Sequence, residues 1–302
     1  MKKIHGMIYA VSSAVAFGFV PVFAVIAYRG GTNAITAVFL RFFAAALILF
    51  GILYVRKTKF ILSRKLFGRI AYLSIVGYAA TCVTLFLSYN YMSIGLATTL
   101  HYIYPAIVTV MSLFIFKEKI GKIKILSLIM SILGVYILAG SKENAVSMTG
   151  VALALASGGF YSLYTIELGR EDIKSIDGLL LTFYVSLFSA TSTFIYGAAT
   201  RSLKLDIQPI GIFSVLGLAL ICTVFAILAY SRAVNIIGPS DTAILSTFEP
   251  VTGVVLGIFV FGERLNYSLA AGSFLIILAV LFFSYNERKR NPEIAALGVS
   301  QN

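Results

Sequence analysis

The same pattern occurs twice in the chain, as Tyr104–Ile120 (YPAIVTVMSLFIFKEKI) and as Glu249–Leu265 (EPVTGVVLGIFVFGERL). Each copy holds a proline, an apolar run, a phenylalanine and a glutamate in the same register, at an offset of about 145 residues. An internal repeat of this length indicates the architecture before any local motif is considered. The matched pairs are Pro105 with Pro250, Phe116 with Phe261, Glu118 with Glu263, Gly6 with Gly150, and Ser13 with Ser157.

Composition places both copies in a membrane. The chain has 302 residues, 59% hydrophobic and 12% charged, with a mean hydropathy of +0.95, which water-soluble globular chains do not normally reach. A bilayer core of about 30 Å needs about 20 apolar residues per helix, so ten spans fit into the chain. The ten apolar runs are Gly6–Tyr28, Ala34–Tyr54, Ile70–Tyr89, Leu96–Phe116, Ile123–Gly140, Thr149–Leu168, Gly178–Ala199, Ile210–Tyr230, Pro239–Phe261 and Tyr267–Tyr285.

The sequence therefore predicts an all-α, polytopic membrane protein with ten transmembrane helices, because runs this long are helices rather than barrel strands. Residues 1–140 and 147–290 form two five-helix repeats, and residues 291–302 form a cytoplasmic tail. Since five is an odd number, the second repeat enters the membrane from the opposite side and is inverted. Inverted repeats are the architecture of secondary transporters, with the substrate site near the midplane.

Basic residues set the orientation. With the N-terminus inside, 18 of the 24 Lys and Arg residues fall on the cytoplasmic side, so both termini are expected in the cytoplasm. The formal charge of +12 is thus a topology signal and does not indicate a nucleic-acid partner. Tyrosines near span ends are expected to act as interfacial anchors because the chain has no Trp: Tyr28, Tyr54, Tyr89, Tyr230, Tyr267 and Tyr285.

The repeated stretch, together with LRFFAAALILF at Leu40–Phe50 and GPSDTAI at Gly238–Ile244, resembles the EamA-type family of the drug/metabolite transporter superfamily over nearly the whole chain. The resemblance implies ten helices in the plasma membrane around a central cavity. It implies that the first, third, fourth, sixth, eighth and ninth spans line this cavity, and that small metabolites are transported, often outward. It implies no particular substrate.

Glu249 is the leading functional candidate, because ionisable groups inside the hydrocarbon cost several kcal/mol. On a helix it would share one face with Thr242, Ser246 and Gly253. Two functional roles are open: binding an amine or other cation of the substrate, or carrying a coupling proton. The structural alternative is that the carboxylate satisfies backbone groups freed by Pro250.

His101 would share a helical face with Thr98, Tyr102 and Pro105. Its imidazole either contacts substrate, where it could pair with Glu249, or is a neutral group hydrogen-bonded within the bundle; both interpretations stay open. His5 is the only other histidine, so no metal site is expected.

The other candidates are aromatic, hydroxyl-bearing or basic. Tyr161, Tyr164, Tyr78 and Thr81 suit a small amphipathic or aromatic solute, although packing is the alternative role for each. Arg41, the one cation well inside a span, is expected to fix helix packing, with a role as counter-ion for anionic cargo as the alternative.

Further residues are predicted to be structural or to act in gating. Pro105 and Pro250 are expected to bend their spans, as is Pro21. Glu118 and Glu263 end the fourth and ninth spans, where a carboxylate opposes the helix dipole unless a cation such as Lys122 or Arg264 compensates.

These features favour a secondary transporter of small metabolites, such as amino acids or related amphipathic solutes, working by alternating access and exporting them. Its partners are the solute and the lipid bilayer, with protons as a coupling ion still open, as is the choice between monomer and homodimer. A membrane-embedded enzyme and a non-transporting scaffold are the alternatives. The sequence shows no nucleophile–base arrangement, metal motif or cofactor signature, so we expect neither catalysis nor a cofactor.

Overall fold

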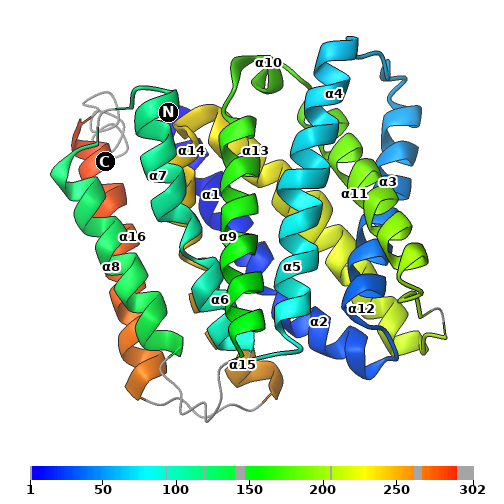
Figure 1. The fold of residues 1–302 in the computed structure, drawn as a ribbon. Helices are drawn as coiled ribbons and strands as arrows, with labels where there is room; N and C mark the ends of the chain where they lie inside the picture. Colours follow the sequence, from blue (N-terminus) through cyan, green and yellow to red (C-terminus); the bar gives the residue numbers. More distant parts are fainter. Residues whose placement is uncertain are drawn as a thin grey trace, which may run out of the picture.

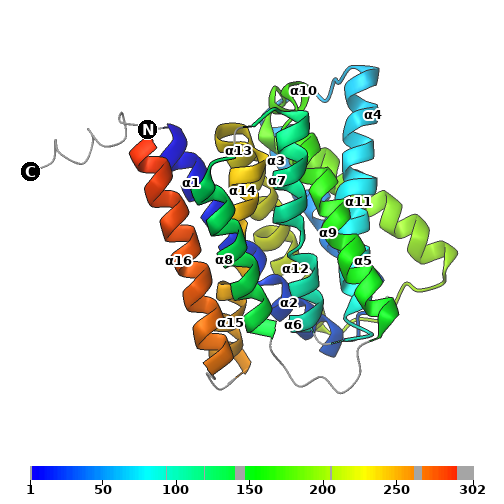
Figure 2. The same ribbon diagram turned by 60° about the vertical axis from the view of Figure 1, so that its left-hand side comes forward.

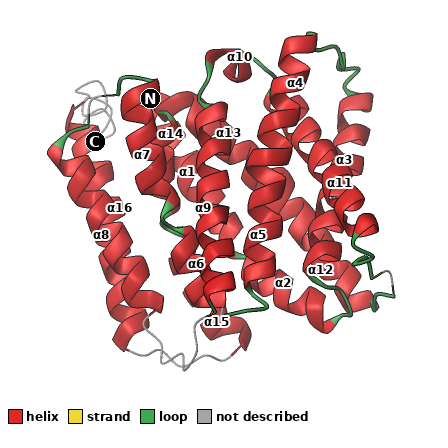
Figure 3. Cartoon of the chain, in the orientation of Figure 1, coloured by secondary structure: helices red, strands yellow, loops and turns green. Residues whose placement is uncertain are grey.

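The computed structural model describes residues 2–92, 94–118, 120–139, 147–204, 206–261 and 267–290. Within these ranges every regular element is a helix, as Figure 3 shows. Eight helical stretches are long and apolar enough to cross a membrane, and α16 contains a shorter apolar stretch, Ala270–Asn286. The prediction of an all-helical, polytopic fold is thereby confirmed.

The helices in chain order are α1 (Lys2–Gly18), α2 (Val20–Arg29), α3 (Ala34–Val55), α4 (Arg64–Tyr72), the π-helix η1 (Leu73–Ala79), α5 (Ala80–Ser88), α6 (Ile94–His101), α7 (Tyr104–Ile115), α8 (Lys122–Ala139), α9 (Met148–Leu168), α10 (Glu171–Lys174), α11 (Gly178–Ala199), α12 (Pro209–Ala219), the π-helix η2 (Leu220–Phe225), α13 (Ala226–Ile237), α14 (Pro239–Ser246), α15 (Glu249–Phe261) and α16 (Tyr267–Arg290).

Three apolar segments are each split into two helices just before a proline. α2, α7 and α15 begin one residue before Pro21, Pro105 and Pro250. Proline has no N–H to donate, and a helix tolerates it best in the first turn, so each proline starts a new helix. One expectation is corrected here: since α14 and α15 are separate helices, the polar residues around Glu249 do not lie on one continuous helical face.

The two halves of the chain repeat these irregularities in opposite directions. In Figures 1 and 2 the α6–α7 pair runs toward the end of the bundle that carries α10, and the α14–α15 pair runs away from it. A π-helix precedes each pair, η1 between α4 and α5 and η2 between α12 and α13. We call this end, where α1 also begins and α16 ends, the α10 end.

The halves are interlocked, because each main helix pair takes one helix from each half. α1 packs on α13, α3 on α11, α5 on α9 and α8 on α16. At the first of these contacts the Ser13 hydroxyl donates to the Ala226 carbonyl at 2.9 Å. At the last, Gly134 lies so close to Gly272 and Ile276 that a Cβ atom would collide with them. One apolar core therefore spans both repeats.

Candidate functional site

A cluster of six tyrosines occupies the interior of the bundle: Tyr78, Tyr102, Tyr104, Tyr161, Tyr164 and Tyr230. Ring centroids are 4.8 Å apart for Tyr78 and Tyr164, 4.8 Å for Tyr104 and Tyr161, and 5.6 Å for Tyr161 and Tyr230. All six side chains are buried. We refer to them as the tyrosine cluster; they come from η1, the α6–α7 break, α7, α9 and α13.

Three of these six tyrosines have hydroxyl groups that lack a hydrogen-bond partner among the described residues. The hydroxyls of Tyr102, Tyr104 and Tyr164 are buried and have no hydrogen-bond partner among the described residues. Buried polar groups in folded proteins are nearly always hydrogen-bonded, so each of these hydroxyls marks a place for a water molecule or a ligand group. The Tyr230 hydroxyl, by contrast, is 2.8 Å from the Thr165 hydroxyl.

Glu249 lies beside this cluster, at the first position of α15 and half-buried. The Tyr102 hydroxyl faces its carboxyl group, and the Tyr104 hydroxyl faces Ser246, although neither contact has the geometry of a hydrogen bond. Arg41 is the cation that acts on the carboxyl group, through space, and the two form no ion pair among the described residues. The titratable groups around the carboxyl group are otherwise uncharged: Tyr78, Tyr89, Tyr102, Tyr104, Tyr230 and Cys222.

His101 packs against the tyrosine cluster, but no contact with Glu249 is found among the described residues. Its Nδ1 atom is 2.9 Å from the Ser157 hydroxyl, and its ring is 5.3 Å from that of Tyr104. Because the Ser157 hydroxyl donates to the Ala154 carbonyl at 2.6 Å, we assign His101 as the donor from Nδ1, which leaves Nε2 as an acceptor. The structure does not bring the predicted pair of His101 and Glu249 together.

The predicted hydroxyl ligands mostly bond to their own helices. Thr81 donates to the Gly77 carbonyl at 2.7 Å and Ser246 to the Thr242 carbonyl at 2.9 Å, the usual arrangement for hydroxyls inside a helix. Thr98 interacts with the Tyr89 hydroxyl. The Thr81 and Ser246 hydroxyls therefore have no proton left to donate, but their oxygen atoms can still accept a hydrogen bond from a substrate.

Arg41 lies on the buried face of α3, away from the exposed Phe43 and Leu47. Its Nε donates to the Thr223 hydroxyl at 3.0 Å, and its Nη2 donates to the Cys222 carbonyl at 2.9 Å. Both acceptors belong to η2, where the wider turn of a π-helix disturbs the usual backbone bonding. The guanidinium group thus braces η2, and within the described residues no carboxylate pairs with it.

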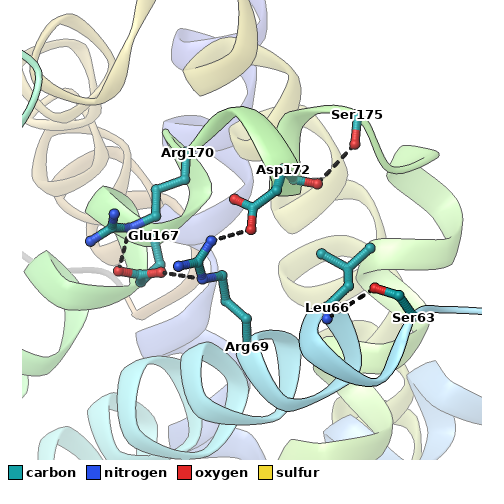
Figure 4. A network of polar contacts seen from close by, with 7 residues as sticks. All are labelled: Ser63, Leu66, Arg69, Glu167, Arg170, Asp172 and Ser175. Atoms are coloured by element: carbon teal, nitrogen blue, oxygen red, sulfur yellow. Dashed lines mark hydrogen bonds and ion pairs between the residues drawn. The ribbon is translucent and has the colours of Figure 1, made fainter.

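Ion pairs join the two halves at the α10 end. Lys124 lies 3.1 Å from Glu118 and 2.6 Å from Asp241, so it bridges an acid of each half; Lys124, not Lys122, is the cation that accompanies Glu118. In a second network Arg69 contacts both Glu167 and Asp172 (Figure 4). Glu263, the repeat partner of Glu118, lies outside the described residues.

Sequence reasoning missed two members of the tyrosine cluster. Tyr230 is fully buried rather than interfacial, because α13 continues to Ile237 and places Tyr230 two turns inside the helix. Tyr104 stands at the position of the first repeat that corresponds to Glu249 in the second, and this correspondence could have identified Tyr104 as a site residue.

Comparison with known proteins agrees with the family resemblance seen in the sequence. The model of the EamA-like transporter family matches residues 4–140 and 148–285. Two uncharacterized transporters of Archaeoglobus fulgidus are 27% and 25% identical over 183 and 209 residues, or 59% and 69% of this chain. The uncharacterized transporter YwfM of Bacillus subtilis is 28% identical over 174 residues, 56% of this chain. These matches cover 62%, 74% and 56% of the relatives' own lengths.

A solved crystal structure shares the fold. It aligns with a TM-score of 0.79 over 95% of this chain and 98% of that chain, at 14% sequence identity. The chain therefore has the two-repeat architecture of membrane transporters of small solutes.

Proposed function

The chain belongs to the EamA-like transporter family, and from this premise we propose that it is a secondary transporter of small amine-bearing metabolites, amino acids foremost. In this proposal α8 and α16 complete a set of ten membrane spans, the α10 end faces the cytoplasm, and substrate is exported through alternating access. The basic loops support the orientation, and the resemblance to the family supports the direction.

The observation that carries this proposal is the Glu249 carboxyl group, which forms no ion pair among the described residues, beside the unpartnered hydroxyls of Tyr102 and Tyr104. A carboxylate in an apolar interior is unstable unless it is neutralised or paired. A substrate ammonium group supplies the missing charge and up to three hydrogen-bond donors. The tyrosine faces attract the same cation, since aromatic rings present negative potential at their faces.

The position of Arg41 favours an amino acid over a simple amine as the substrate. It is the other buried charge near the site, it acts on Tyr78 and Glu249 through space, and it has no carboxylate partner in the described part of the chain. A zwitterion with its ammonium group toward Glu249 and its carboxylate toward Arg41 complements both charges. An aromatic or aliphatic side chain would then pack on the tyrosine rings.

Counterflow in proteoliposomes tests this function. Vesicles loaded with an unlabelled amino acid are placed in a trace of the labelled one, and a panel of amino acids, amines and organic anions is compared. Because counterflow needs alternating access but no driving force, we expect the wild type to accumulate label for at least one amine-bearing solute.

The matched variants are Glu249→Gln and Glu171→Gln. Glu171 lies on the short α10 helix with its side chain 90% exposed, so its substitution should leave transport unchanged. We expect Glu249→Gln to reduce counterflow by at least about tenfold, equivalent to about 1.4 kcal/mol of lost interaction with the amine. Equal counterflow by the two folded variants would remove Glu249 from the binding site, and flux of organic anions alone would refute the substrate class.

A further inference from the structure

α8 and α14 form a polar seam that leads from the α10 end toward Glu249. Lys124 of α8 contacts Asp241 of α14 at 2.6 Å, and seven residues further along α8 the Ser131 hydroxyl accepts a hydrogen bond from the Thr247 hydroxyl at 3.1 Å. Since both contacts advance in the same chain direction, the two helices run parallel along this stretch. We call these four residues, with Ser127 between them on α8, the α8–α14 seam.

Ser127 is the unusual member of the seam. It lies three residues after Lys124 and four before Ser131, which places it on the same face of α8, and it is fully buried. Its hydroxyl has no hydrogen-bond partner among the described residues, not even the carbonyl of its own helix. By contrast, the buried hydroxyls of Thr109 on α7 and Thr242 on α14 bond to their own helices, at 2.7 and 2.8 Å.

A second unpartnered hydroxyl lies on α7, which also packs against α14. On α7 Thr109 accepts from the Ser240 hydroxyl of α14 at 3.1 Å, and one turn later the buried Ser112 hydroxyl has no partner in the described chain. Ser112 and Ser127 are thus two buried hydroxyls without a partner in the described chain, on two helices that pack against α14, and proteins commonly satisfy such groups with bound water.

The spacing of the seam suits such water. Residues three or four apart on a helix face are about 5–6 Å apart, and one water molecule with two hydrogen bonds of about 2.8 Å spans that distance. Lys124, Ser127 and Ser131 are spaced in this way. The outer end of the seam is the partly accessible cluster of Glu118, Lys124 and Asp241, and its inner end is Thr247, in the break between α14 and α15 at which Glu249 begins α15.

We propose that the α8–α14 seam holds a file of water molecules through which the Glu249 carboxyl group exchanges its proton with the α10 end of the bundle. This inference rests on the proposed function and adds the coupling ion to it. A proton leaves the Glu249 carboxyl group, passes along the file and is released at the acids beside Lys124. The carboxylate that remains takes the ammonium group of the substrate, so no other reactant is needed.

The second repeat has no equivalent file. At the offset of 145 residues, Lys124, Ser127 and Ser131 correspond to Leu269, Gly272 and Ile276, and Asp241 corresponds to Leu96. Apolar residues at these positions cannot hold a chain of water molecules. In this proposal the seam links Glu249 to the α10 end, and Arg41 is the charged group that acts on the carboxyl group from the other described helices.

Ser127→Val and Ser127→Thr test the seam, because valine and threonine have the same shape and differ only in the hydroxyl group. Proteoliposomes containing a pH-sensitive dye report proton movement driven by the amino acid identified in counterflow. We expect Ser127→Val to slow this proton movement by at least about tenfold, as for loss of a relay group. Ser127→Thr should stay near wild type, and Thr193→Val controls for loss of a buried hydroxyl elsewhere.

Counterflow separates the possible failures, because exchange of substrate for substrate needs no net movement of protons. Ser127→Val should therefore keep counterflow within about twofold of wild type, which also shows that it folds. Should Ser127→Val be unstable, Ser127→Ala and Ser131→Ala together remove the same hydroxyls without added bulk. Equal proton movement in the Val and Thr variants overturns the seam, as does wild-type counterflow without coupled proton movement. Absence of wild-type counterflow overturns the proposed function and the seam with it.

Discussion

The α6–α7 and α14–α15 pairs share a sequence pattern and a helix break but contribute different chemistry. Pro105 and Pro250 stand in the same register, and each begins a new helix. At the equivalent positions just before the two prolines, α7 presents Tyr104 and α15 presents Glu249. Proline acts on the backbone, so both copies keep the break, whereas the neighbouring side chains are free to diverge.

A second pair of related segments shows that the break is lost where the proline is not repeated. The first apolar segment is broken between α1 and α2 near Pro21, but its counterpart α9 is continuous, because the equivalent position at an offset of 144 is Thr165. The difference matters, since α9 supplies Tyr161 and Tyr164 to the tyrosine cluster from one straight helix. A repeat thus yields symmetric geometry only where the proline is repeated.

The largest effect should come from Arg41, which stands where the second half has Val185 at the same offset. Arg41→Met removes two charge-assisted hydrogen bonds to η2, and we expect it to lower the free energy of unfolding by about 2–4 kcal/mol. Thermal unfolding in detergent measures the loss. Arg56→Met, at an exposed position, is the control. If both variants melt together, Arg41 does not brace η2.

A smaller loss is expected at the contact of α8 with α16. Gly134→Ala makes the first half match Ala279, its equivalent in the second half, but the new Cβ atom would lie 2.7 Å from Ile276 Cγ1 and 3.0 Å from the Gly272 carbonyl oxygen. We expect a destabilisation of about 1–3 kcal/mol from overpacking. Gly159→Ala meets no atom within 4 Å, so it should be neutral or slightly stabilising. If the Gly134→Ala and Gly159→Ala variants melted at the same temperature, α8 and α16 would pack less closely at Gly134 than the structure shows.

The smallest effects concern the equivalent serines Ser13 and Ser157. Ser13 bonds to the Ala226 carbonyl across the α1–α13 contact, and Ser157 bonds to Ala154 and His101. We expect each alanine variant to cost about 1 kcal/mol of stability, the usual worth of a hydrogen bond. Only Ser157→Ala should also alter counterflow, because it frees the His101 ring beside Tyr104. If Ser13→Ala altered counterflow and Ser157→Ala did not, the expected difference between the two serines would be wrong.

Much of the architecture follows from the sequence. Hydropathy, the repeat and the positions of Pro21, Pro105 and Pro250 predicted the helical fold and its breaks, because these are properties of short segments of the chain. The direction of each repeat also follows from counting spans, without any knowledge of which helices touch. The role of α8 and α16 as the fifth and tenth membrane spans remains a prediction, as do the roles assigned to the site residues.

The tertiary structure alone decided which side chains meet. Tyr104 and Tyr230 are as apolar in context as the exposed Tyr136 and Tyr196, so the local sequence does not distinguish cluster members from lipid-facing rings. The separation of His101 from Glu249, the bridge from Lys124 to Asp241 and the unpartnered Ser127 were equally hidden. In a uniformly apolar helix the inward face is set by the helices packed against it, and residues 100 or more positions apart supply those contacts.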